Sequence, residues 1–304
     1  VADTPKVTET LIDLFKIDME TGKSTPQGTA SLEGAEFTWS YYDGYYNADN
    51  LPAKATRTWT TKTIAEKDSA GTIHYVSRLA DNYKVSGDSF YTQDGKNVLP
   101  LGTLTVTETK APNGYLLDGA YMQTDGSSEQ IKGTYLTQIS EDGELAVLSG
   151  SNQYSVSDKV IRGGVKIQKR DLETKDTKAQ GSATLQYTEF NIISLNDSPV
   201  LVEGKLYNKN ETVKKIQTGI DGIASTSADL LPVVTDKNGQ FSTASSWASH
   251  KVNTNAGKSS EDGVWFGTSE PDDSKGALLY DTYVIKELKC DSNAGFKLIP
   301  AFEV

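Results

Sequence analysis

The sequence contains two copies of one unit, and this internal repeat limits the possible folds more than any other feature. The first copy opens with residues 14–21, LFKIDMET, and the second with residues 167–174, IQKRDLET. The two segments are 153 positions apart (167 − 14), and the spacing holds without a gap as far as Phe37 and Phe190. Such a fixed spacing indicates duplicated structural units. We therefore expect two domains of the same fold, one after the other.

Both copies consist of short β-rich runs separated by turn residues, and no stretch has the hydrophobic period of a helix. The 304 residues leave room for two domains of ordinary size. The sequence thus predicts an all-β chain of two β-sandwiches. We place a closing strand of a preceding unit, or a linker, at residues 1–7. The first domain spans 8–162 and the second 163–304, which we expect to lack its last strand.

The run from Leu104 to Tyr115 contains an acidic residue on an apolar face. Leu104, Val106 and Glu108 point to the same side of the predicted strand because side chains alternate along a strand. A carboxylate on a core face costs several kcal/mol unless it is paired or protonated. Two alternatives remain open at this point. Either the register drifts at the strand end and leaves Glu108 in water, or Glu108 is a buried acid with a chemical role.

Residues 108–115, ETKAPNGY, match every fixed position of the E-box, ET-x-AP-x-GY. The chain therefore resembles the SpaA-type, or Cna B-type, domains of surface proteins and pilins of Gram-positive bacteria. The resemblance implies tandem immunoglobulin-like β-sandwiches, and each copy exceeds the usual size of such a domain because of loop insertions. It also implies a self-made isopeptide bond between Lys16 on the first strand and Asp158 on the last. In this family the E-box glutamate, here Glu108, promotes that bond.

Such a cross-link requires an amine, a carboxyl group and a proton-transfer acid between them. Burial disfavours the charged forms of these groups, which leaves a neutral amine and a protonated acid. Fixed contact supplies an effective molarity of about 10⁵ M or more, and Glu108 would move the protons. The reaction is a single autocatalytic event rather than turnover. The alternative is that Lys16 extends its ammonium group into solvent and Asp158 is an exposed loop acid.

In the second copy, Lys169 and Glu287 take the places of Lys16 and Glu108, with Lys166 as a nearby alternative amine. This second box departs from the pattern, because its Thr and its Ala-Pro are replaced and its turn is longer. No acceptor follows the box in the sequence. We therefore expect the second pair to remain unlinked in this chain.

The composition argues against several classes of function. A net charge of −11 disfavours nucleic acid and anionic membrane surfaces as partners, and no apolar run reaches the roughly 18 residues of a membrane span. Cys290 is the only cysteine, and we expect an inert packed thiol. His74 and His250 lie in unrelated segments. Residues 236–239, DKNG, resemble the start of a calcium loop, but Trp247 stands where such a loop needs glutamate. We expect no enzyme, no cofactor and no metal.

These features favour a structural stalk or spacer in a cell-wall-anchored, extracellular surface protein or pilin, with the neighbouring domains as partners. Neither a signal peptide nor a wall anchor is present, so we expect a piece of a longer protein. The alternative is an adhesin domain that binds a host matrix protein or a glycan. Its contacts would come from aromatic loops inserted at 41–47 and 245–266. Such aromatic residues also commonly pack under their own loop.

Overall fold

The computed structural model describes residues 7–9, 13–124, 130–140, 154–160, 162–163, 165–202, 204–226, 230–232, 234–235, 241–242, 265–267, 278–279 and 281–304. This part is almost entirely β-structure, and its one helical element is the 3-10 helix η3 (Asp291–Asn293). The predicted all-β class is therefore confirmed. Residues 1–6, residues 236–239 and most of the second inserted loop, with Trp247 and His250, lie outside the described residues.

The chain folds into two compact units. The first comprises Val1–Pro26 with Ser31–Lys159, and the second Gln27–Ala30 with Val160–Val304.

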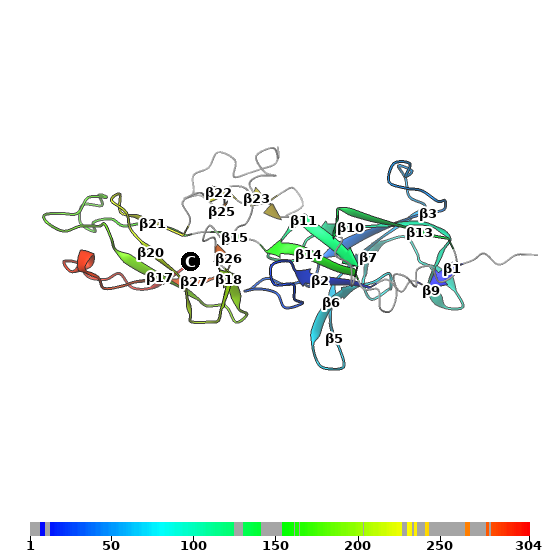
Figure 1. Cartoon of the computed structure of the whole chain (residues 1–304), viewed down its shortest axis with the longest axis horizontal. Coiled ribbons are helices and arrows are strands. Elements are labelled where there is room, and N and C mark those ends of the chain that lie inside the picture. The colour runs from blue at the N-terminus through cyan, green and yellow to red at the C-terminus, as the bar shows by residue number, and fades with distance from the viewer. Residues whose placement is uncertain are drawn as a thin grey trace, which may run out of the picture. The chain divides into compact units, whose positions relative to one another are not determined.

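Two large sheets form the first unit (Figure 1). One sheet has five strands in the order β13 (Thr134–Ile139), β10 (Gly102–Lys110), β3 (Glu36–Tyr42), β4 (Arg57–Lys62) and β7 (Lys84–Gly87). The other has six strands in the order β12 (Gln130–Lys132), β11 (Tyr115–Thr124), β14 (Tyr154–Val160), β2 (Leu14–Asp18), β6 (Ile73–Ser77) and β5 (Ile64–Lys67). A smaller sheet joins β1 (Val7–Glu9), β9 (Lys96–Pro100) and β8 (Tyr91–Gln93).

The hydrophobic core of this unit lies between the five-stranded and the six-stranded sheet. Trp39 and Val106 enter it from the five-stranded sheet, and Leu14 and Val156 from the six-stranded sheet. All four side chains are buried. Two sheets that face each other across a shared apolar layer form a β-sandwich. The first unit thus has the architecture that the alternating strands predict.

The strands β2 and β14 lie side by side and run parallel. Lys16 stands opposite Val156 and Asp18 opposite Asp158, whereas the neighbouring pair β2–β6 is antiparallel. A parallel pair needs a long connection between its strands. Here the connection contains most of the unit, so the fold brings together two segments that are far apart in the sequence.

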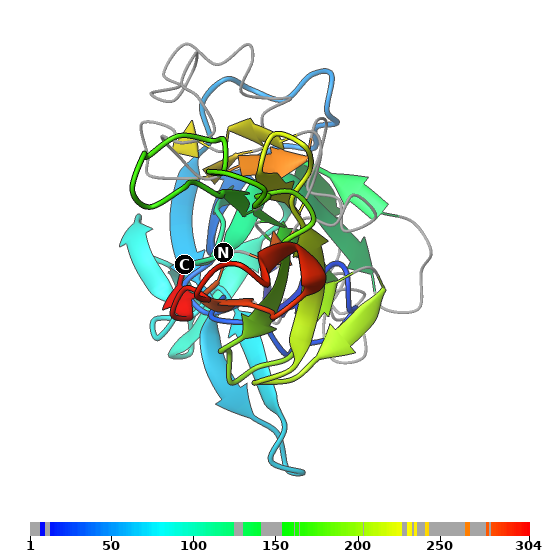
Figure 2. The same ribbon diagram turned by 90° about the vertical axis from the view of Figure 1, so that its left-hand side faces the viewer.

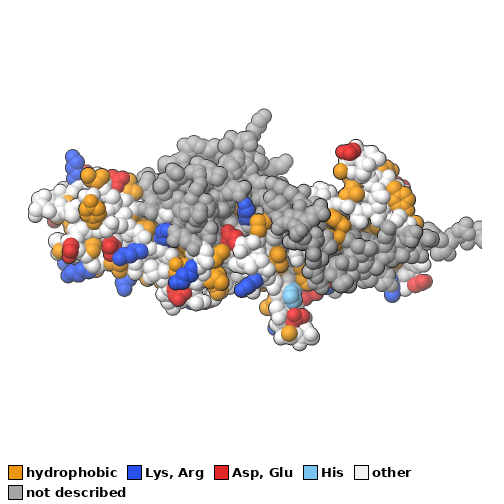
Figure 3. Space-filling model, in the orientation of Figure 1, with side chains coloured by type: hydrophobic (Ala, Val, Ile, Leu, Met, Phe, Trp, Pro, Cys, Tyr) orange, Lys and Arg blue, Asp and Glu red, His pale blue; other side chains and the backbone are white. Residues whose placement is uncertain are grey.

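The hairpin β5–β6 projects from the first unit in both ribbon views (Figures 1 and 2). Figure 3 shows a histidine beside acidic side chains on this hairpin, where His74 Nε2 lies 3.0 Å from Asp68 Oδ2. Arg78 holds the base of the hairpin. Its Nε lies 2.5 Å from Asp13 Oδ1 and its guanidinium 2.8 Å from Glu66 Oε1.

In the second unit, β27 carries the second E-box glutamate and lies between two antiparallel neighbours. The sheet order is β20 (Thr212–Gln217), β17 (Glu189–Ser194), β27 (Tyr283–Glu287) and β28 (Phe302–Glu303). The remaining strands form the pairs β15 (Arg162–Gly163) with β26 (Leu278–Leu279), β16 (Lys166–Gln168) with β21 (Ile223–Ser225), β18 (Val200–Val202) with β19 (Lys205–Tyr207), β22 (Leu230–Pro232) with β25 (Trp265–Gly267) and β23 (Val234–Thr235) with β24 (Phe241–Ser242).

The last strand of the described chain, β28, is the counterpart of β13 rather than of β14. It pairs with β27 in antiparallel fashion, as β13 pairs with β10 in the first unit. Within the described residues, no strand runs parallel to β16 in the way that β14 runs parallel to β2.

Thr61 provides a test of how the two sheets of the first unit are joined. Trp39 Nε1 donates a 2.7 Å hydrogen bond to Thr61 Oγ1, which lies 2.6 Å from Ser77 Oγ of the opposite sheet. Thr61→Val leaves the buried Trp39 and Ser77 groups unsatisfied, so we expect a loss of about 1–3 kcal/mol in the free energy of unfolding. Urea unfolding followed by fluorescence measures it. The control is Thr58→Val, whose side chain is exposed on the same strand. An equal effect of both substitutions would contradict the expectation.

Candidate functional site

The strand β2 turns its charged side chains inward. Leu14, Lys16 and Asp18 are buried at the sandwich core, while Phe15 and Ile17 on the opposite face are only partly buried. Burying charged groups in this way costs several kcal/mol unless partners compensate for them. The partners of Lys16 and Asp18 are therefore the first thing to establish.

The strand β10 supplies one partner from the opposite sheet. Leu104, Val106 and Glu108 share its buried face, as their alternation in the sequence predicts. The Glu108 side chain is 3% exposed, so the alternative with Glu108 in water does not apply. The register of β10 on β3 shifts between Glu108 and Lys110. Bulges of this kind bend a strand and re-aim its side chains, and they are frequent next to functional sites.

The turn after the bulge returns the chain to the core. Gly114 has a φ of +85°, a left-handed conformation that glycine adopts without steric cost. The backbone N–H of Tyr115 donates to the carbonyl oxygen of Pro112 at 3.1 Å and closes the turn. The buried Tyr115 then begins β11. The fixed residues of the E-box thus shape the turn as well as provide the acid.

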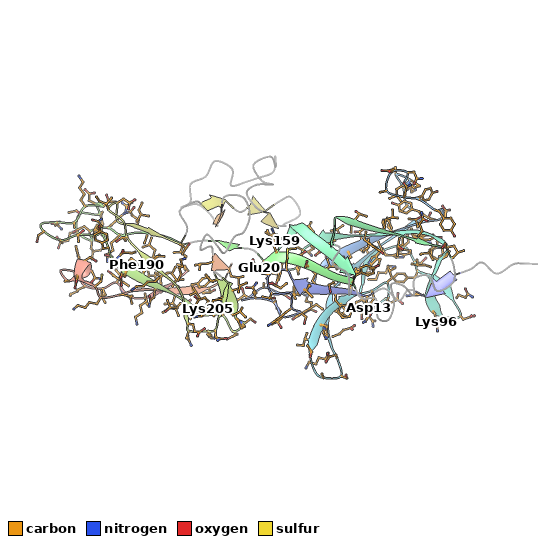
Figure 4. All side chains as sticks on the ribbon, viewed as in Figure 1. Asp13, Glu20, Lys96, Lys159, Phe190 and Lys205 are labelled. Carbon is orange, nitrogen blue, oxygen red and sulfur yellow. The ribbon has the colours of Figure 1, made fainter. Side chains whose placement is uncertain are left out.

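Three predicted site residues meet in the core of the first unit. Lys16 Nζ donates to Glu108 Oε2 at 2.6 Å and lies 2.7 Å from Asp158 Oδ1. The Lys16 and Asp158 side chains are completely buried. Lys16 and Asp158 come from neighbouring strands of one sheet, and Glu108 comes from the other. Figure 4 labels Glu20, which follows the end of β2 by two residues, and Lys159, which directly follows Asp158 in β14.

Both carboxyl groups lie where their protonated form is favoured. Burial, and after it the charge of Asp158, raise the pKa of Glu108 well above its ordinary value, although Lys16 acts in the opposite direction. Burial likewise raises the pKa of Asp158 against the effect of Lys16. Within the described residues, Glu108 Oε1 and both Asp158 oxygens have no hydrogen-bond partner. The close approach of Lys16 to Asp158 therefore lacks hydrogen-bond alignment. An amine in contact with a protonated carboxyl group is the arrangement that amide formation needs.

Two further buried residues belong to this site, although no pattern in the sequence predicted their role. Tyr115 Oη donates a 2.8 Å hydrogen bond to Asp18 Oδ2. Asp18 lies two positions after Lys16, on the same strand face, and Tyr115 stands where the second copy has Phe296. The alternation in β2 and this difference between the copies were the available signals.

The corresponding pair of the second unit is also in contact. Lys169 Nζ forms a buried ion pair with Glu287 Oε1. The backbone N–H of Ile299 donates to Glu287 Oε2 at 2.9 Å, and Asn293 Nδ2 donates to Oε1 at 3.3 Å. Both oxygens of Glu287 are therefore satisfied, whereas Oε1 of its counterpart Glu108 has no hydrogen-bond partner among the described residues. The side chain of the alternative amine, Lys166, lies outside the described residues.

Most aromatic side chains of the first inserted loop pack against the protein. Tyr41 and Tyr42 are buried, and the Tyr46 ring packs edge-on against Tyr42 with 6.2 Å between ring centroids. Tyr45, by contrast, is 51% exposed. In this loop Tyr45 is thus the large aromatic side chain that remains accessible to a partner. Residues 245–264 of the second loop lie outside the described residues.

Cys290 is partly exposed rather than packed, and its Sγ lies 3.1 Å from Ser292 Oγ. Burial raises the pKa of this thiol, but hydrogen bonds, that of Ser292 first among them, outweigh it and lower the pKa below its ordinary value. In the part of the chain that the structure describes, no group of three His, Cys, Asp or Glu side chains is suited to hold a metal ion. No helix in that part is long and apolar enough to span a membrane.

The sequence matches no protein-family model, and no curated protein matches it significantly. Among solved structures, the Bacillus anthracis TIE protein aligns with 98% of this chain at 19% identity and a TM-score of 0.40, and this chain spans 31% of that chain. The SpaE basal pilin from Lactobacillus rhamnosus GG aligns with 79% of this chain over 90% of its own length, at 10% identity and a TM-score of 0.25. At these values, neither similarity assigns a function to this chain.

The ion pair of the second unit can be tested by removing its cation. Lys169→Met leaves the buried Glu287 carboxylate without its counter-charge, so we expect a loss of about 3–5 kcal/mol in the stability of this unit. Calorimetry should show a lower melting temperature for the second unit alone. The control is Lys215→Met, because the Lys215–Glu189 pair is largely exposed and worth about 1 kcal/mol or less. Similar losses for both variants would contradict this assignment.

Proposed function

We propose that this chain is a structural module of a surface protein, built from tandem immunoglobulin-like domains at 8–162 and 163–304. It serves as a spacer between neighbouring domains of an extracellular, cell-wall-anchored protein or pilin. A covalent amide between Lys16 and Asp158, promoted by Glu108, locks the first domain. The observation that carries this proposal is the buried contact of these three side chains between the first and last strands of the sandwich.

The chemistry of the cross-link balances with the groups in contact. Glu108 takes one proton from the Lys16 ammonium, and the neutral amine attacks Cγ of the protonated Asp158 carboxyl group. The new N–C bond forms, and the C–OH bond of Asp158 breaks. A second amine proton joins the departing hydroxide, so one water leaves and Glu108 keeps the first proton. The raised pKa of Glu108 suits it to hold that proton next to the new amide.

Burial and fixed contact favour this otherwise unfavourable condensation. The fold holds the amine and the acid within 2.7 Å of each other at a completely buried position. Well-oriented groups of this kind reach effective molarities of about 10⁵–10⁸ M. The product stays between two strands of the same chain, so each molecule reacts once.

The position of the bond suits a protein that carries tension. The chain enters the sandwich through β2 and leaves it through β14, and these strands are parallel neighbours. Pulling on both ends of the unit therefore shears the two strands past each other and loads their inter-strand hydrogen bonds together. An amide from Lys16 to Asp158 would carry the load directly from one strand to the other. The 141 residues between them would then stay folded under tension.

The intact mass tests this proposal. We expect the folded chain to weigh about 18 Da less than its sequence mass, because one water is lost. Glu108→Gln removes the proton transfer, which slows the reaction by about 10²–10⁴-fold and leaves the full sequence mass. Lys16→Ala and Asp158→Ala should also keep the full mass. Glu287→Gln, the matched change in the second unit, should still lose one water.

Stability gives a second readout of the same bond. A cross-link that closes a loop of 142 positions (158 − 16) contributes about 5 kcal/mol through loop-closure entropy. Lys16→Ala should therefore lower the melting temperature of the first unit and expose it to trypsin, without a similar effect on the second. A wild-type mass equal to the sequence mass would refute the cross-link.

A further inference from the structure

A second buried acid lies beside the acceptor of the proposed cross-link. Asp18 on β2 stands directly opposite Asp158 on β14, and neither residue is exposed to solvent. Residues that face each other across paired strands are close neighbours, and two like charges in such positions repel each other. Lys16, Asp158 and Glu108 are sufficient for the proposed condensation. The chemistry therefore does not explain why a second acid, Asp18, is buried next to Asp158.

The protein holds the two carboxyl groups in opposite ways. Asp18 Oδ1 accepts hydrogen bonds from the backbone N–H groups of Glu20 and Thr21, both at 2.9 Å. Its Oδ2 accepts the 2.8 Å hydrogen bond from Tyr115. Neither oxygen of Asp158 has a hydrogen-bond partner among the described residues. Donors stabilise a carboxylate, so the hydrogen bonds favour negative charge on Asp18 over negative charge on Asp158.

Two of the other groups that face Asp158, Lys16 and Glu108, act against this division, because both lower the pKa of Asp158. Lys16, also on β2, favours the ionised form of Asp158, and Glu108 approaches from β10. Burial raises the pKa of Asp158, and the charge of Asp18 acts in the same direction. Asp18 therefore offsets part of the effect of the lysine that must later attack.

We propose that Asp18, held by Tyr115, is a positioning residue whose negative charge keeps the Asp158 carboxyl group in the protonated form that the amine attacks. This inference rests on the proposed cross-link and adds the device that prepares its acceptor. The negative charge of Asp18 favours the same condensation of Lys16 with Asp158, in which one water is lost. This step requires no further reactant.

The second unit shows the same turn without this device. Asp171 accepts from the backbone N–H groups of Glu173 at 2.9 Å and Thr174 at 3.0 Å, as Asp18 does in its own turn. Phe296 stands at the position of Tyr115, and Asp171 receives a side-chain hydrogen bond from Gln180 instead. Asp18 and Asp171 thus both cap their turns. In the first unit, Asp18 also accepts a hydrogen bond from Tyr115 and lies opposite the acceptor Asp158.

The test follows cross-linking of the full chain as a function of pH. Unlinked chain recovered in urea is diluted into folding buffers from acid to alkaline pH, quenched at intervals and weighed by mass spectrometry. Asp18→Asn keeps an oxygen for the turn and removes only the charge. Asp171→Asn is the matched control, and Tyr115→Phe removes the hydrogen bond but keeps the charge.

The expected sign follows from the proton on Asp158. As the pH rises, the cluster loses the proton that the reaction needs, so the plot of rate against pH falls on its alkaline side. The pH of this alkaline limb is an apparent pKa of the coupled groups together and not of one residue. Removing the charge of Asp18 makes that proton easier to lose. Asp18→Asn should therefore move the limb to lower pH and slow the reaction about tenfold at neutral pH. Asp171→Asn should match the wild type, and Tyr115→Phe should keep the limb at or above the wild-type pH.

Each remaining outcome decides the question. A wild-type pH profile in Asp18→Asn would show that Asp18 only caps its turn. A downward shift in Tyr115→Phe as large as that in Asp18→Asn would rule out the charge as the cause. If circular dichroism shows that Asp18→Asn is unfolded, Asp18→Ser gives the same comparison with a smaller turn-capping oxygen. A wild-type chain that never loses water refutes the cross-link itself, and this inference with it.

Discussion

The burial of one lysine amine between two carboxyl groups is the interaction on which the first unit depends. Lys16 is completely buried, and its amine touches Glu108 from one sheet and Asp158 from a neighbouring strand. An apolar core tolerates such groups only when charge and hydrogen bonds are compensated. Here the oxygens of Asp158 remain without hydrogen-bond partners in the described structure. Formation of the amide, with Glu108 keeping the proton from Lys16, would remove the lysine and glutamate charges from the core.

The two copies of the repeat show how one pair of residues can serve two purposes. In the second unit the Lys169–Glu287 pair is held by an amide side chain and a backbone N–H, so the glutamate is fully satisfied as an ion. In the first unit the equivalent glutamate also faces a second acid, carried by β14. The two units differ because β14, which carries Asp158, lies beside the lysine strand β2 in the first unit, whereas β16 of the second unit pairs with β21. The same starting pattern thus gives a buried salt bridge in one unit and a lysine between two buried carboxyl groups in the other.

Much of this site could be predicted from the sequence. The period-2 pattern places Glu108 on the core face, the resemblance carried by residues 108–115 implies Lys16 and Asp158 as its partners, and the repeat spacing favours Lys169 as the counterpart of Lys16. The hydrogen bond between Asp18 and Tyr115 could not be predicted in that way, because it joins residues 97 positions apart and depends on the turn after the bulge. The position of β28 is another example. Its two residues carry no strand pattern of their own, and pairing with β27 alone defines the strand.

A tryptic digest of the folded, then denatured, chain tests the central claim most directly. Trypsin does not cleave after an acylated lysine, so the cross-link predicts one branched peptide in which residues 7–23 are joined to residues 133–159. Fragmentation should locate the branch at Lys16 and Asp158, with the mass of one water missing. Separate linear peptides 7–16 and 133–159, each at its full mass, would contradict the account.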